Sequence, residues 1–139
     1  MTEADSTAPP ARLLGQAVRR GLAGRCPRCG QGRLFRAYLK VDDACPVCGE
    51  DFTPQRADDA PAYITILLVG HFIVAGVVAA EDIWPNSPVL IDAFVWAALA
   101  VALSLLTLPR VKGALIGYQW AVRMHGFGEA EGDRAWRGE

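Results

Sequence analysis

The chain has 139 residues, of which 52% are hydrophobic and 21% are charged, and its net charge is −1. The hydrophobic share is high for a soluble domain of this length, and the apolar residues are unevenly distributed. The first 60 residues are polar and rich in turn formers, whereas two long apolar runs follow a composition break near Pro61. The composition favours a small polar domain followed by a membrane segment over one soluble domain.

Residues 1–20 are expected to form a disordered or weakly amphipathic lead. The first ten, MTEADSTAPP, are acidic and proline-rich, and no apolar core of usable length follows them, which argues against a cleavable signal peptide. Within residues 11–22, leucine, alanine and valine alternate with arginines. This is a weak pattern for a helix at a membrane surface.

Four cysteines occupy two similar motifs, Cys26-Pro27-Arg28-Cys29-Gly30 and Cys45-Pro46-Val47-Cys48-Gly49. Fifteen residues separate the two C-x2-C pairs, a spacing typical of zinc sites. Each proline stiffens its turn, and each glycine permits a positive φ that brings backbone N–H groups toward the sulfurs. The pattern predicts a cytoplasmic zinc ribbon over residues 21–60, with Cys26, Cys29, Cys45 and Cys48 as the metal ligands.

Other uses of paired cysteines fit this sequence less well. A disulfide needs an oxidising compartment, and a thioredoxin-like pair needs a βαβ pattern that is absent. Haem attachment needs a histidine where Gly30 and Gly49 stand. Iron stays open as an alternative to zinc, because a rubredoxin-like site uses the same four thiolates.

The segment between the motifs, residues 32–41, is rich in aromatic and aliphatic residues and begins with glycine. It predicts a short strand or hairpin that closes the ribbon, with a small core of Leu34, Phe35, Tyr38 and Leu39. Because a core of this size cannot stabilise a fold alone, metal binding is expected to supply most of the folding free energy.

Two apolar runs are long enough to cross a membrane. Residues 62–80 carry no charge over nineteen residues, which is about 28 Å of helix, and residues 89–108 form a second run that Pro109 is expected to end. The connection is short, so residues 61–109 are predicted to form a transmembrane hairpin. The alternative is a pair of buried helices in a soluble domain, but no amphipathic helix is available to cover them.

Lysine and arginine are distributed asymmetrically around these runs. Nine precede the first run, five follow the second, and the connection has none. The positive-inside rule therefore places both termini in the cytoplasm. A reducing cytoplasm also suits thiolate ligands.

Beyond Pro109, the apolar residues Val111, Leu115, Tyr118 and Val122 recur at helical spacing among basic residues. Residues 110–127 are expected to form an amphipathic juxtamembrane helix. Two arrangements are open: a helix on the cytoplasmic membrane surface, or a continuation of the second span that packs on the ribbon. Residues 128–139 are expected to be a disordered tail.

His71 lies at the midpoint of the first apolar run. An ionisable side chain at bilayer depth is costly, so His71 is a candidate for binding a haem or metal, or for relaying protons. The alternative is a neutral histidine that is hydrogen-bonded to another helix. Since the sequence has no Ser/His/Asp set, phosphate-binding loop or HExxH motif, nothing argues directly for an enzyme.

The ribbon carries five basic residues, Arg25, Arg28, Arg33, Arg36 and Lys40, beside two aromatic ones. This combination permits nucleic-acid binding. Two simpler roles account for the same charges: a four-thiolate zinc site has a net charge of about −2 that attracts cations, and arginines beside a membrane favour anionic lipid.

Several motifs together resemble the bacterial domain of unknown function 983 family. The resemblance rests on GRCPRCG at 24–30, CPVCG at 45–49, ADDAPAY at 57–63, GH at 70–71 and PRVKG at 109–113, and it covers residues 20–127. Ala60 departs from the family pattern, in which glycine commonly follows the two aspartates. The resemblance implies a zinc-ribbon protein of the bacterial inner membrane, associated in proteobacteria with the biogenesis of haem–copper cytochrome oxidase.

The leading hypothesis is a non-enzymatic accessory or assembly factor. Its ribbon would meet cytoplasmic partners, and its hairpin would pack against helices of a respiratory complex such as cytochrome oxidase. One alternative is a membrane enzyme or a metal- or haem-handling protein that uses His71. Another is a membrane-tethered nucleic-acid binder.

Overall fold

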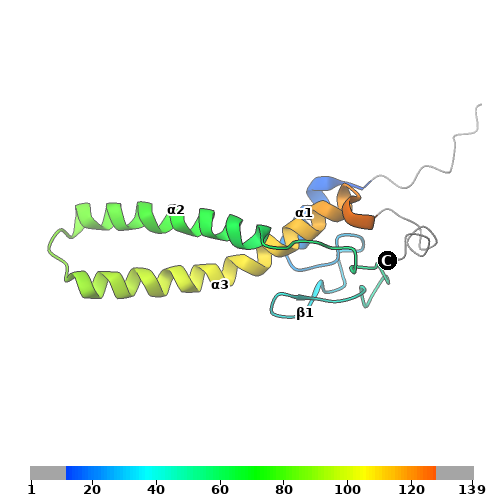
Figure 1. Cartoon of the computed structure of the whole chain (residues 1–139), viewed down its shortest axis with the longest axis horizontal. Coiled ribbons are helices and arrows are strands. Elements are labelled where there is room, and N and C mark those ends of the chain that lie inside the picture. The colour runs from blue at the N-terminus through cyan, green and yellow to red at the C-terminus, as the bar shows by residue number, and fades with distance from the viewer. Residues whose placement is uncertain (1–11, 128–139) are drawn as a thin grey trace, which may run out of the picture.

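The computed structural model describes residues 12–127, and it places a small ribbon at one end of a long two-helix hairpin (Figure 1). In chain order the elements are α1 (Leu14–Leu22), β1 (Phe35–Ala37), β2 (Lys40–Val41), α2 (Ala60–Ile83), α3 (Val89–Ala121) and the 3-10 turn η1 (Met124–Gly126). Strands β1 and β2 pair antiparallel. The predicted tail 128–139 and residues 1–11 of the predicted lead lie outside the described residues.

Helices α2 and α3 form the hairpin, and both are long and apolar enough to cross a membrane. Pro61 stands in the first turn of α2, where its missing N–H leaves no helical hydrogen bond unmade. The most apolar windows of α2 and α3 are only 11% and 0% buried. Core helices of a soluble domain would be mostly buried, so the exposed faces favour the membrane hairpin over that alternative.

The prediction that Pro109 ends the second helix was wrong. Helix α3 continues to Ala121 with Pro109 in its interior, and Figure 1 shows it changing direction as it leaves the hairpin. Proline has no N–H, so the carbonyl of Leu105, four residues earlier, lacks its helical donor. The Tyr38 hydroxyl donates a hydrogen bond to that carbonyl over 2.8 Å. This contact satisfies the freed carbonyl, which allows the helix to pass through the proline.

Replacing Tyr38 with phenylalanine is expected to destabilise the junction between ribbon and hairpin by about 1 kcal/mol, because the Leu105 carbonyl loses its donor. The ring remains, so packing is preserved. Urea unfolding of the detergent-solubilised protein measures the change, with Tyr63→Phe as the control because Tyr63 is 72% exposed on α2. Equal stability of the two variants would show that the hydroxyl does not support the kinked helix.

Residues 110–121 take one of the two arrangements expected for this region, since they continue the second helix and pack on the ribbon instead of forming a separate surface helix. The buried core joins this end of α3 to the ribbon and to α1. It consists of Ala17, Cys26, Leu34, Cys45, Phe52, Ile116, Trp120 and Phe127. Of the predicted ribbon core, Leu34 is fully buried, whereas Tyr38, in the turn between β1 and β2, is 53% exposed.

Helix α1 crosses the end of α3 in the opposite direction, a contact that the sequence analysis did not predict. A Cβ added at Gly21 would lie 2.1 Å from the carbonyl oxygen of Gly113, and one at Gly117 would lie 2.4 Å from that of Ala17. The two backbones therefore touch through paired small residues spaced four apart, as in tightly packed membrane helices.

Candidate metal centre

The two C-P-x-C-G motifs fold into turns of the same shape. The N–H of Gly30 donates to the Cys26 carbonyl over 2.8 Å, and that of Gly49 donates to the Cys45 carbonyl over 2.9 Å. Both glycines have positive φ, +72° and +74°, which confirms the conformational role predicted for them. Each turn places its two cysteine side chains on the same side, toward the other turn.

The sulfurs of Cys26, Cys29, Cys45 and Cys48 all lie within 4.8 Å of one another. The Cys26–Cys48 and Cys29–Cys45 sulfurs are each 3.7 Å apart, far beyond the disulfide length of about 2.05 Å. A tetrahedral zinc with Zn–S bonds of about 2.3 Å requires sulfurs about 3.8 Å apart. The four thiols thus fit a tetrahedral metal ion, and zinc and iron both satisfy this geometry.

Backbone N–H groups surround the sulfurs. Gly32 N lies 3.4 Å from the Cys29 sulfur, and the nitrogens of Val47 and Cys48 each lie 3.5 Å from the Cys45 sulfur. N–H groups at this distance stabilise thiolates and tune the site in the same way as outer hydrogen bonds around metal ligands. The arrangement is suited to four negatively charged sulfurs.

Gly32 has a role that its sequence position did not reveal. A Cβ at this residue would lie 2.1 Å from the Cys45 sulfur, and the Gly32 carbonyl accepts a hydrogen bond of 2.8 Å from the N–H of Cys26. Only glycine therefore leaves room for the second motif to close onto the first.

The surroundings separate the acidities of the thiols. The hydrogen bond from the Gly32 N–H is the largest cause that lowers the pKa of Cys29 to about 6. Burial is the main cause that raises the pKa of Cys26 and the pKa of Cys48. At pH 7 the metal-free site therefore holds a thiolate at Cys29 and neutral thiols at Cys26 and Cys48.

Zinc uptake at pH 7 is expected to release at least two protons, from Cys26 and Cys48, because both pKa values are raised and both residues bind metal as thiolates. Zinc affinity should consequently fall by at least about 100-fold for each pH unit below 7. Calorimetric titration in two buffers of different ionisation enthalpy measures the released protons. A zinc affinity that does not change between pH 6 and pH 7 would contradict the assigned protonation states.

Glu50, next to the second motif, ties the centre to α3. One carboxylate oxygen pairs with Arg28 at 3.1 Å, and the other accepts a hydrogen bond of 2.9 Å from the Trp120 indole. The Arg12 guanidinium lies over the same indole, 4.3 Å from the ring centre, and donates to the Phe127 carbonyl over 2.9 Å. The sequence analysis did not identify Glu50 as a functional residue.

Two further contacts hold the ribbon against α3. The Lys112 ammonium donates a hydrogen bond of 2.7 Å to the carbonyl of Leu39, which lies in the turn between β1 and β2. The amide of buried Gln119 both accepts a hydrogen bond from the N–H of Arg56 and donates one to the Arg56 carbonyl. The metal centre and the helical hairpin are therefore joined along one side of α3.

Ion pairs reduce the basic surface that suggested nucleic-acid binding. Arg28 pairs with Glu50, and Arg33 pairs with Asp42, each over 3.1 Å. Two of the five basic residues named for that role are thus paired with acidic residues of the ribbon. The observation favours the simpler roles of these charges.

His71 lies on α2, apart from the cysteines, and its side chain is exposed. Its Nδ1 is 2.8 Å from the Leu67 carbonyl oxygen, one turn earlier in the same helix. Since a carbonyl only accepts, Nδ1 is the donor in this hydrogen bond. Within residues 12–127, the four cysteines are the only group of three or more His, Cys, Asp or Glu side chains close enough together to share a metal ion. His71 is not part of it.

Fold and site together define a class: proteins with a four-cysteine ribbon at the base of a helical hairpin that is apolar enough to span a membrane. The chain belongs to the family described as protein of unknown function DUF983, which it matches over residues 35–120. The match begins after the first cysteine motif, and it contains the second cysteine motif, α2 and all but the last residue of α3. No curated protein and no solved structure matches the chain.

Proposed function

We propose that the protein is a non-enzymatic accessory or assembly factor of a respiratory membrane complex. The α2–α3 hairpin anchors it in the bacterial inner membrane. The ribbon lies in the cytoplasm, and a structural zinc ion stabilises its fold. The closed set of four thiolates carries this proposal. Structural metal sites use all four positions, whereas catalytic zinc sites keep one position open for substrate or water.

Two other observations support the membrane anchor. The most apolar windows of α2 and α3 are largely exposed, and such faces suit lipid or the helices of a partner protein. Nine lysines and arginines precede the hairpin and five follow it, with none between the helices. This charge distribution supports cytoplasmic placement of both termini.

The proposed partner is haem–copper cytochrome oxidase, which the family resemblance implies. The test is purification of the tagged protein from its own membranes in mild detergent, with mass spectrometry of what accompanies it. Oxidase subunits or oxidase assembly proteins are expected in stoichiometric amounts, and a deletion strain should lose haem–copper oxidase absorbance. Normal oxidase content in the deletion strain, with no oxidase subunit in the purified sample, would refute this role.

A metal- or haem-handling function is the second candidate, and the exposed side chain of His71 is the observation that favours it. If the assembly role holds without chemistry at this position, His71→Ala should leave both ribbon zinc and oxidase content unchanged within twofold. Oxidase content is measured from haem absorbance in membranes of a deletion strain that expresses either the wild type or one of the variants. Loss of oxidase in His71→Ala, with His71→Gln equally inactive and both proteins folded, would favour the ligand role instead.

A further inference from the structure

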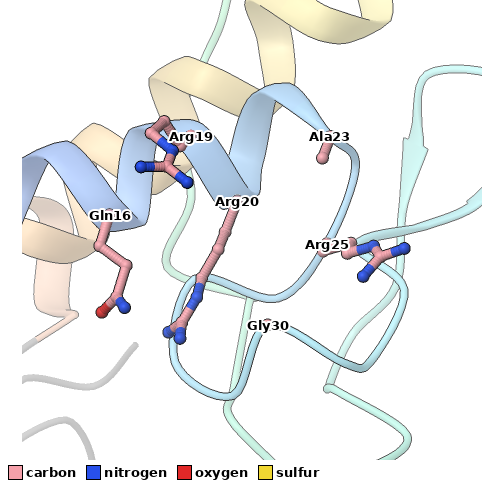
Figure 2. Close-up of a pocket in the computed structure, with 6 residues that line it drawn as sticks. All are labelled: Gln16, Arg19, Arg20, Ala23, Arg25 and Gly30. Carbon is pink, nitrogen blue, oxygen red and sulfur yellow. The ribbon is translucent and has the colours of Figure 1, made fainter.

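A basic pocket of ≈ 470 Å³ lies between α1 and the first cysteine motif (Figure 2). Its lining consists of Gln16, Arg19, Arg20, Ala23, Arg25 and Gly30. Three of these six residues are arginines and none is acidic. Figure 2 shows Arg20 reaching from α1 to the loop that holds Gly30, with Arg25 across the space on the segment after the helix.

Arg20 is held in place by the first cysteine motif. One guanidinium nitrogen donates to the carbonyls of Pro27 and Arg28, over 3.0 and 2.8 Å. A Cβ at Gly30 would lie 2.7 Å from the Arg20 side chain, so the absence of a side chain at Gly30 leaves room for Arg20. The carbonyl partners fix the guanidinium without neutralising its charge, which is the preorganisation that an anion site requires.

Arg19 and Arg25 are exposed. Within residues 12–127 neither forms an ion pair, in contrast to Arg28 and Arg33, which pair with acids. Three arginines thus line one pocket, with no carboxylate in its lining. Planar guanidinium groups bind phosphate oxygens through two parallel hydrogen bonds, which makes a phosphate group the anion best matched to this set.

The position of the pocket identifies the source of the phosphate. Ala23 also lines an adjoining pocket with Pro109 and Arg110, where α3 leaves its apolar run. The end of α1 touches Gly113, which is five residues beyond Leu108 and therefore about 8 Å along the helix. The headgroup layer on each side of a bilayer is about 5–8 Å thick. Because α3 changes direction at Pro109, the end of α1 lies no farther than about 8 Å beyond the apolar run, which puts the pocket beside the lipid phosphates in the proposed membrane placement.

We propose that this pocket binds the phosphate group of an anionic phospholipid headgroup in the cytoplasmic leaflet. The inference rests on the membrane placement in the proposed function and is independent of the proposed oxidase partner. Lipid bound here would contact α1 and the first cysteine motif together, and would thereby fix the ribbon against the membrane surface.

The test uses the full chain with its metal, purified in an uncharged detergent and titrated with dioctanoyl phosphatidylglycerol by native mass spectrometry. Neither a bilayer nor a partner is present, so failure of the oxidase role does not affect the result. Arg19→Gln/Arg25→Gln should bind the lipid about 30-fold more weakly than wild type. The matched control is Arg36→Gln/Lys40→Gln, which removes two exposed charges elsewhere on the ribbon and should retain wild-type affinity.

Zinc content and circular dichroism confirm that both double variants are folded. Equal weakening in the two variants would overturn the site and leave only diffuse attraction between charges. Inorganic phosphate binding as tightly as the lipid, with the same loss in Arg19→Gln/Arg25→Gln, would overturn the lipid source and assign the pocket to a soluble phosphate. Preferential binding of the lipid over both phosphate and dioctanoyl phosphatidylcholine supports the proposal.

Discussion

Replacing Cys26 with serine is expected to unfold the ribbon while the α2–α3 hairpin stays helical. The Cys26 side chain is fully buried and its sulfur is one of the four that converge. Structural zinc in small domains supplies apparent binding energies of about 10–16 kcal/mol, and these domains are unfolded without it. The ribbon has only short strands and a small core, so it has little else to stabilise it.

Metal analysis and limited proteolysis measure this outcome in detergent. Wild type should hold about one zinc per chain and resist cleavage between residues 25 and 56, and Cys26→Ser should lose both properties. A chelator strong enough to remove zinc should make wild type behave like the variant. A Cys26→Ser protein that keeps its metal and its protease resistance would contradict a four-thiolate structural site.

Gly32→Ala is expected to give the same result although all four cysteines remain, because its Cβ would lie 2.1 Å from the Cys45 sulfur. The matched control is Gly70→Ala, at a position with nothing within 4 Å of the added carbon. Normal zinc binding in Gly32→Ala would show that the turn can open without loss of the site.

The features that local patterns encode were predictable from the sequence. The spacing of the four cysteines was enough to predict that they cluster. The two motif glycines adopt the expected positive φ. The uninterrupted apolar runs correctly predicted the long helices α2 and α3. The predicted fold class, a small β-hairpin with a four-cysteine cluster and two long apolar helices, is confirmed. Each of these features depends on residues close to one another in the chain.

The features that were missed depend on distant partners. Proline in a helix is unfavourable by local rules, and only Tyr38, 67 residues before Leu105, removes the penalty at Pro109. The crossing of α1 and α3 is carried by small residues, which leave no periodic apolar signal. The contact of Glu50 with Arg28 arises only once the two cysteine motifs meet, and its contact with Trp120 only once the ribbon meets α3.

Valine at Gly113 is expected to separate α1 from α3. A Cβ at this position would lie 2.1 Å from the Gly21 carbonyl oxygen, and both partners are backbone, so no side chain can rotate to make room. Overpacking in cores costs about 1–3 kcal/mol when side chains can adjust, so a backbone clash should cost at least about 3 kcal/mol. Displaced α1 would also draw Arg12 away from the Trp120 ring.

Chemical unfolding followed by tryptophan fluorescence measures the loss, and zinc content tests whether the ribbon survives. The control is Gly15→Ala in the same α1 helix, where the added carbon meets nothing within 4 Å and alanine should raise stability by up to about 1 kcal/mol. Wild-type stability in Gly113→Val would mean that α1 is not held by this crossing. Loss of stability with zinc retained would separate the two supports of the ribbon, since the metal would then hold the cysteine motifs without help from α1.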